Sequence, residues 1–103
     1  MKVALAQLNY TIGDFEGNKQ KIISGIEKAR NKGADLVVFS ELSVTGYYPH
    51  DLLEKKEFIQ KAEAVVQEIA GSCHGIAAII GAPRINKNER GKQLFNAAFF
   101  MAD

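Results

Sequence analysis

Apolar residues in the first part of the chain form a short run and then recur at helical spacing. The run Val3–Leu8 opens the chain and predicts a buried strand. Gly13 and Asp14 then turn the chain. From about Asn18, the expected N-cap, apolar residues follow at spacings of four and three, and Gly33 stands where helices commonly have a C′ glycine. The apolar side of this predicted helix consists of Ile22, Ile26 and Ala29.

A second apolar run, Leu36–Phe39, has no polar alternation, which is typical of a parallel strand covered on both faces. The succession of strand, helix and strand predicts a βαβ unit, whose crossover is right-handed in nearly all known proteins. The next ten residues, Ser40–Pro49, are rich in polar and turn-forming types and predict a loop.

The remaining pattern predicts one more helix and two more strands. The helix is expected over Asp51–Ala70 and a buried strand over Ile76–Ile80, closely followed by Pro83. Residues 86–91 are polar and end in glycine, so they predict a hairpin loop into an antiparallel strand, Leu94–Met101. The apolar face of the helix is expected to hold Phe58, Ala62, Val65, Val66 and Ile69.

These elements predict an α/β fold with a βαβαβ core and a further antiparallel strand, and 103 residues fit one domain rather than two. The chain ends at Asp103, directly after an apolar strand. An unpaired strand edge would therefore be exposed, which natural domains usually avoid. We expect residues 1–103 to be a portion of a single larger domain.

Composition excludes several classes of function. Hydrophobic residues make up 47% and charged residues 24% of the chain, which favours a folded globular domain over a disordered one. Thirteen basic and twelve acidic side chains are interleaved, so a nucleic-acid or membrane surface is not indicated. No run reaches the ~20 apolar residues of a membrane span, and no secretory signal stands at the start. The single cysteine fits a reducing compartment, so a cytoplasmic location is expected.

Metal, nucleotide and cysteine chemistry receive little support from the sequence. The first strand-to-helix turn matches neither a dinucleotide fingerprint nor a P-loop. His50 and His74 lack partners at metal-ligand spacing, so no metal site is predicted. Cys73 precedes the third strand, at the end of the sheet where that strand enters, whereas ligands bind open α/β sheets beyond the carboxyl ends of the strands. A structural or surface role for Cys73 is therefore favoured over a nucleophilic one.

Glu41 is the candidate for acid–base chemistry. It follows the buried strand Leu36–Phe39 at its carboxyl end, where α/β sheets present residues to ligands. A carboxylate against an apolar wall loses solvation, which raises its pKa toward that of a useful general base. The alternative is a strand-end glutamate that is solvated or caps the following loop.

Several segments resemble, in order and spacing, the nitrilase or carbon–nitrogen hydrolase superfamily. They are Val3–Asn9, Gly13 and Asp14 with Asn18, Gly33–Tyr47, Ile80–Pro83 and Phe95–Phe99. Thr45–Leu53 further resembles the Gly-Tyr-Pro-Pro-Glu-Asp-Leu pattern of the glutaminase domain of glutamine-dependent NAD synthetases. Tyr48 and His50 stand where that pattern has Pro and Glu.

The resemblance implies that residues 1–103 are the N-terminal portion of one such domain, which is part of an α-β-β-α sandwich with a Glu–Lys–Cys site. In that family the cysteine thiolate attacks a side-chain amide, the glutamate acts as general base and then acid, and the lysine supports the oxyanion. Glu41 matches the glutamate, whereas the lysine and cysteine positions lie past Asp103 and Cys73 does not match. The segment alone is therefore expected to be inactive.

Two further residues come from the same comparison. Tyr47 matches a loop aromatic that is implied to line the glutamine pocket, and its alternative is a packing residue that stiffens the loop. Asp51 is expected to be a helix N-cap rather than a substrate contact.

The resemblance also implies what the intact protein does. It would release ammonia from glutamine for a C-terminal synthetase domain that uses ATP and Mg²⁺ to make NAD from deamido-NAD, and it would form a homo-oligomer. Two alternatives remain open. One is another amidase of the superfamily acting on a small amide, and the other is a non-catalytic α/β interaction module in which Glu41 is only structural.

Overall fold

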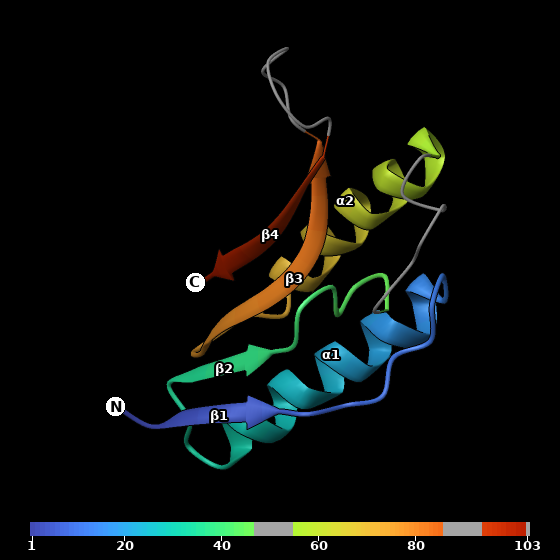
Figure 1. Ribbon diagram of the computed structural model, residues 1–103. Helices are drawn as coiled ribbons and strands as arrows, with labels where there is room; N and C mark the ends of the chain where they lie inside the picture. The colour runs from blue at the N-terminus through green and yellow to red at the C-terminus, as the bar shows by residue number, and fades with distance from the viewer. Residues whose placement is uncertain (47–54, 86–93, 103) are drawn as a thin grey trace.

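The computed structural model describes residues 1–46, 55–85 and 94–102, which form one sheet and two helices (Figure 1). The strands lie in the order β1-β2-β3-β4, with the first three parallel and β4 antiparallel to β3. The predicted α/β fold, with its βαβαβ core and antiparallel last strand, is confirmed. The elements are β1 (Val3–Ala6), α1 (Phe15–Asn31), β2 (Leu36–Phe39), α2 (Lys56–Ala70), β3 (Ala77–Ile85) and β4 (Leu94–Met101).

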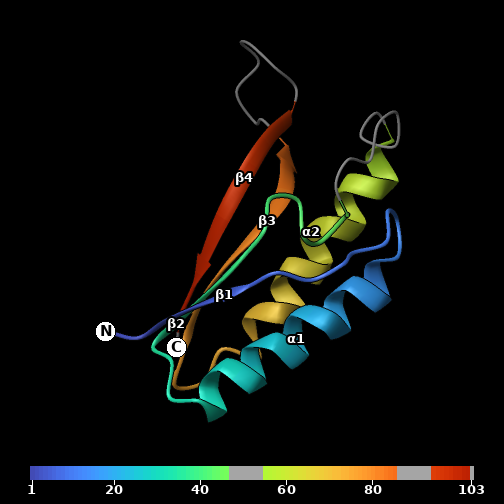
Figure 2. The ribbon, with the colours of Figure 1, turned by 60° about the horizontal axis from the view of Figure 1, so that its bottom comes forward.

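Both helices cover the same face of the sheet (Figure 2). Alternate strand residues point into the layer between helices and sheet, as the two-residue period of a strand requires. Val37 and Phe39 of β2 and Ala78 and Ile80 of β3 are buried there. The fully buried helix residues opposite them include Ile22, Ile26, Ile59 and Ile69.

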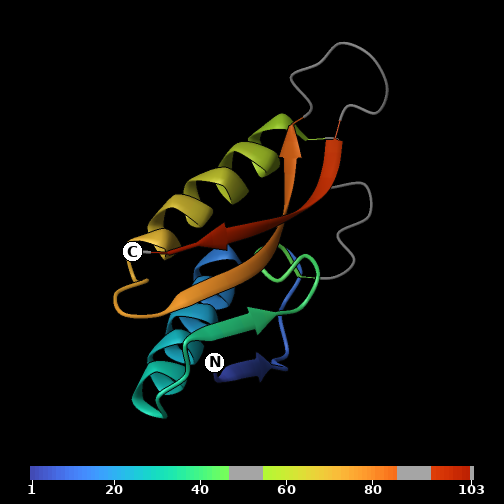
Figure 3. The same ribbon diagram turned by 90° about the vertical axis from the view of Figure 1, so that its left-hand side faces the viewer.

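No helix of the described part of the chain lies on the other face of the sheet (Figure 3). The expected burial of β1 is therefore wrong for this segment, since Val3 is 47% and Leu5 75% exposed. The expectation that β2 is covered on both faces is also wrong here, because Leu36 and Val38 are only half-buried. Their side chains are apolar, yet they lie on the uncovered face.

Helix α1 begins earlier than predicted. Its N-cap is Asp14, whose carboxylate accepts the backbone N–H of Gly17 at 3.0 Å, so the prediction of Asn18 as N-cap is wrong. Asn18 is instead fully buried in the first turn, where tertiary hydrogen bonds engage its amide. Gly33 follows the C-cap with a φ of +78°, which confirms it as the C′ glycine.

Helix α2 begins at Lys56, so the predicted start at Asp51 is wrong, and Asp51 itself lies outside the described residues. Lys55 is the N-cap, with an extended backbone whose carbonyl accepts the first helical N–H groups. Gly71 ends the helix as predicted. Phe58 is half-buried and packs on Phe15 with ring centroids 4.9 Å apart.

Strand β3 runs through Pro83 to Ile85, well beyond the predicted end at Ile80. Gly81 directs both its N–H and its carbonyl toward the turn after β2. The backbone polar groups of successive strand residues point to alternate sides, so the nitrogen of Pro83 lies on the same side as that of Gly81. The N–H that proline lacks therefore removes no hydrogen bond to β4. The predicted hairpin loop, 86–91, lies outside the described residues.

Candidate active site

Glu41 lies directly after β2, in a turn formed by residues 41–45 at the carboxyl end of the strand. Two shallow hollows meet at this residue. One, of about 360 Å³, is lined by polar and apolar groups of the segment after β1 together with Ser40 and Glu41. The other, of about 340 Å³, lies along β2, β3 and β4 and includes Ile79, Gly81 and Ala98. The predicted location of Glu41 at a concave rim of the sheet is thus observed.

The predicted partial burial of Glu41 is not observed. The residue is exposed, and Phe39, two positions earlier, is buried on the helix side of the sheet. Apolar residues of the second hollow, such as Ile79 and Ala98, lie near Glu41 but leave its side chain open to solvent.

The turn itself is buried from Leu42 to Gly46, so only its first residue reaches the surface. Leu42 has a φ of +51°, in the left-handed region that residues with a side chain rarely adopt. The Gly46 N–H donates to the Leu42 carbonyl at 2.9 Å and closes the turn. Glu41 is thus the exposed end of a compact, buried structure.

Asn18 joins this turn to the segment after β1. Its Oδ1 accepts the N–H of Thr11 at 2.9 Å, and its Nδ2 donates to the carbonyls of Thr11 at 2.8 Å and Val44 at 3.1 Å. The Gly13 N–H donates to the Thr45 carbonyl at 2.9 Å beside it. Sequence reasoning missed this role. The sequence feature that could have indicated it is the spacing of Gly13, Asp14 and Asn18, which is part of the family resemblance.

Tyr10 lines the hollow beside Glu41 and was also missed by sequence reasoning. Its hydroxyl oxygen is buried and makes no hydrogen bond of ordinary geometry with any described residue. Burial raises the pKa of this hydroxyl above its usual 10.0, and the neighbouring Ser40 side chain offsets part of that rise. Tyr10 is therefore an uncharged residue in the wall of the hollow.

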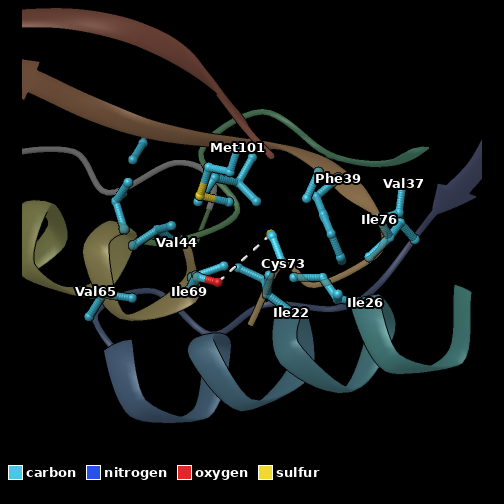
Figure 4. Packing of buried hydrophobic residues seen from close by; sticks show 14 of the residues in the cluster. Ile22, Ile26, Val37, Phe39, Val44, Val65, Ile69, Cys73, Ile76 and Met101 are labelled. Atoms are coloured by element: carbon cyan, nitrogen blue, oxygen red, sulfur yellow. Dashed lines mark hydrogen bonds between the residues drawn. The ribbon is translucent and has the colours of Figure 1, made fainter. Parts of the chain in front are cut away.

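Cys73 is far from this rim in the fold. It is 2% exposed in the core below the entering end of β3, with its Sγ 3.9 Å from the Ile69 carbonyl (Figure 4). Ile22 and Ile26 of α1 lie nearby. This position agrees with a structural role, and its lack of a catalytic role stays a prediction.

Tyr47 lies outside the described residues, so its predicted place in the glutamine pocket stays a prediction, and His50 lies outside them as well. Within residues 1–46, 55–85 and 94–102, no three His, Cys, Asp or Glu side chains gather as metal ligands. Neither described helix is long and apolar enough to cross a membrane.

Known proteins resemble this chain over its whole length. Residues 2–103 match the family described as Carbon-nitrogen hydrolase. A glutamine-dependent NAD(+) synthetase from Xylella fastidiosa (strain Temecula1 / ATCC 700964) is 36% identical over 104 residues, which cover 100% of this chain and 18% of that protein. The matched part is the N-terminal region of such synthetases. This chain therefore spans about a fifth of the length of these curated relatives.

Two solved structures illustrate the likeness in fold. The crystal structure of a glutamine-dependent NAD(+) synthetase from Cytophaga hutchinsonii matches with a TM-score of 0.87 and 30% identity, over 97% of this chain and 17% of that one. An amidase from Nesterenkonia sp. AN1, with acrylamide added at its active site cysteine, matches with a TM-score of 0.68 and 26% identity, over 82% of this chain and 34% of that one.

Proposed function

We propose, because this chain belongs to the carbon–nitrogen hydrolase family, that the intact protein hydrolyses the side-chain amide of glutamine. The ammonia released would serve a C-terminal synthetase domain that makes NAD from deamido-NAD with ATP. The names of the relatives, which are glutamine-dependent NAD(+) synthetases, support this choice of substrate and product. The sheet and helices described above are part of a nitrilase-type α-β-β-α sandwich.

The observation that carries the proposal is the position of Glu41. Its carboxylate is exposed at the carboxyl edge of a parallel strand, where two hollows meet and a substrate has access. An exposed carboxylate on a rigid turn can receive a proton from a nucleophile that another part of the protein brings to the same rim.

The proposed chemistry uses Glu41 twice. It takes the proton of a cysteine thiol as sulfur attacks the amide carbon, and it returns that proton to the nitrogen as the C–N bond breaks and ammonia leaves. Water then attacks the thioester, with Glu41 again accepting a proton, and glutamate and the free thiol are formed. The cysteine, and a lysine that supports the oxyanion, come from residues after Asp103.

Substitution Glu41→Gln in the full-length protein tests this role. Glutamine has the same shape but does not accept the proton, so ammonia release from glutamine should fall by about two to four orders of magnitude. NAD synthesis from added ammonium salt should persist, because it bypasses the hydrolysis. An unchanged rate of ammonia release from glutamine would contradict the assignment.

Two controls accompany this variant. Glu27→Gln removes an exposed carboxylate from α1, away from the rim, and should leave ammonia release unchanged. Cys73→Ser should also retain the rate, because this thiol is enclosed in the core at the other end of β3. Loss of activity in Cys73→Ser with normal folding would mean that the nucleophile has been wrongly placed.

The two alternative functions have less support. An amidase acting on a free small amide would fit the fold, but the synthetases match more of this chain and at higher identity than the Nesterenkonia amidase does. A non-catalytic module is disfavoured by membership of a hydrolase family. Tyr47 as a wall of the glutamine pocket, the cytoplasmic location and the homo-oligomer remain parts of the proposal. The ATP and Mg²⁺ belong to the proposed synthetase domain, which lies beyond these residues.

A further inference from the structure

The turn that carries Glu41 rests directly on the backbone of β3. A Cβ atom built on Gly81 would lie 2.4 Å from the backbone nitrogen of Leu42, 3.0 Å from the carbonyl oxygen of Ser40 and 3.1 Å from the carbonyl carbon of Glu41. A side chain at this position would therefore displace the turn. Gly81 lets the two backbones touch immediately beneath Glu41.

Ser43 supplies the hydrogen bonds that hold this contact. The pairing of β2 with β3 ends at Val38 and Ile79, so Gly81 has no strand partner on that side. The Ser43 hydroxyl oxygen accepts the Gly81 N–H at 3.2 Å and lies 3.5 Å from the Gly81 carbonyl oxygen. That carbonyl also accepts the N–H of Val44 at 3.1 Å. The turn thus replaces the missing strand and satisfies both polar groups of Gly81.

These bonds are shielded from water because Ser43 is fully buried. They hold a backbone that would otherwise relax, since Leu42 adopts a left-handed φ of +51° without being glycine. Such a conformation persists only where the surroundings determine it. The residue held in this conformation is the immediate neighbour of Glu41.

We propose that Ser43 is a positioning residue for Glu41, and this inference rests on the proposed role of Glu41 as general base. The Ser43–Gly81 hydrogen bonds keep the strained turn in the one shape that presents the carboxylate at the rim. Without the Ser43 hydroxyl the turn relaxes, and the Glu41 carboxylate then occupies several positions. Proton transfer then slows, because it needs the base within hydrogen-bonding reach of its partner.

The test compares Ser43→Ala with Ser43→Thr in the full-length protein, by kcat and KM for ammonia release from glutamine. Ser43→Ala should lower kcat by about tenfold to a hundredfold with little change in KM, since a small misplacement of a catalytic group costs that much. Ser43→Thr retains a hydroxyl and should recover most of the rate. Ser43→Cys is nearly the size of the parent residue but offers only a weak acceptor, so its kcat should lie between those of the other two variants. It replaces Ser43→Thr if the extra methyl group of threonine prevents folding.

A destabilised control separates positioning from general loss of stability. Cys73→Ala removes a buried side chain remote from the turn, so it should lower Tm while kcat stays near the parent value. If Ser43→Ala also lowers only Tm, Ser43 is structural and the inference is wrong.

A double variant tests whether Ser43 acts through the carboxylate. Glu41→Asp shortens the side chain and already misplaces the carboxylate, so adding Ser43→Ala should cost much less than it does in the parent. If Ser43→Ala lowered kcat by the same factor in the Glu41→Asp background as in the parent, the inference would be wrong. The same measurements distinguish failure of this inference from failure of the proposed function. If Glu41→Gln keeps the parent rate, the proposed role of Glu41 is wrong. If Glu41→Gln is inactive but Ser43→Ala is fully active, only the role of Ser43 is wrong.

Discussion

The Tyr10 hydroxyl is a single group whose removal should help the fold. It is buried without a hydrogen bond of ordinary geometry, and an unsatisfied buried polar group costs about 1–3 kcal/mol. Tyr10→Phe should therefore raise the free energy of unfolding by about 1 kcal/mol, measured by thermal denaturation at neutral pH. Thr45→Val is the matched control and should lower it, because the Thr45 hydroxyl donates to the Gly46 carbonyl at 3.1 Å.

The same residue predicts a pH dependence. Burial raises the pKa of Tyr10 in the folded protein above the usual 10.0, so the folded state keeps this proton when the unfolded state has begun to lose it. The stability of the parent protein should therefore fall as pH rises above 10.0, and Tyr10→Phe should lack that component. Equal alkaline destabilisation of both proteins would show that Tyr10 does not contribute.

At the scale of residues, sequence predicted where Glu41 lies but not how exposed it is. Its place after the apolar run Leu36–Phe39 predicted a position just beyond a strand, and that run coincides with β2. Its exposure depends on which chain segments cover the rim, and these are remote in sequence. Asn18 shows the same limit: Asn and Asp both favour N-caps, and tertiary bonds to Thr11 and Val44 decided between Asn18 and Asp14.

At the scale of elements, α1 is held at its start by two side chains of different kinds. Asp14 caps the helix and is exposed, so Asp14→Ala should lower the free energy of unfolding by about 1 kcal/mol. Asn18→Ala should cost at least about 2 kcal/mol, because it removes a buried hydrogen bond to the Val44 carbonyl and two part-buried ones to Thr11. Thermal denaturation of both variants checks the order, and an equal or larger loss in Asp14→Ala would contradict it.

The element boundaries show why the local apolar pattern predicts whether a segment is a helix or a strand better than it predicts where that element begins and ends. β3 was expected to end at Ile80, shortly before Pro83, but it continues to Ile85. Pro83 fits in the strand because its nitrogen lies on the side of the Glu41 turn and not on the side that bonds to β4. α2 was expected to start near Asp51, yet the extended Lys55 sets its first turn. In both cases a contact or conformation outside the apolar pattern decided the boundary.

At the scale of the whole molecule, the face of the sheet that no described helix covers (Figure 3) carries apolar residues on all four strands. The strand register places Leu5, Val38, Ile79 and Phe100 in one row across all four strands. Leu5 and Phe100 are 75% and 66% exposed. The absence of polar alternation in β2, which predicted burial on both faces, is the pattern expected of a sheet that is covered on both faces in an α-β-β-α sandwich.

This face predicts opposite effects of one pair of substitutions in two settings. In a purified segment of residues 1–103, the apolar row should cause self-association, and Leu5→Lys with Phe100→Lys should reduce it, as measured by analytical ultracentrifugation. We propose that in the full-length protein the second sheet of the sandwich covers this face, and the same pair should then lower stability by roughly 2–5 kcal/mol through burial of charge. Gln67→Lys, on the exposed side of α2, should alter neither property. If the lysine pair left full-length stability unchanged, this face of the sheet would have to be open to solvent in the intact protein as well.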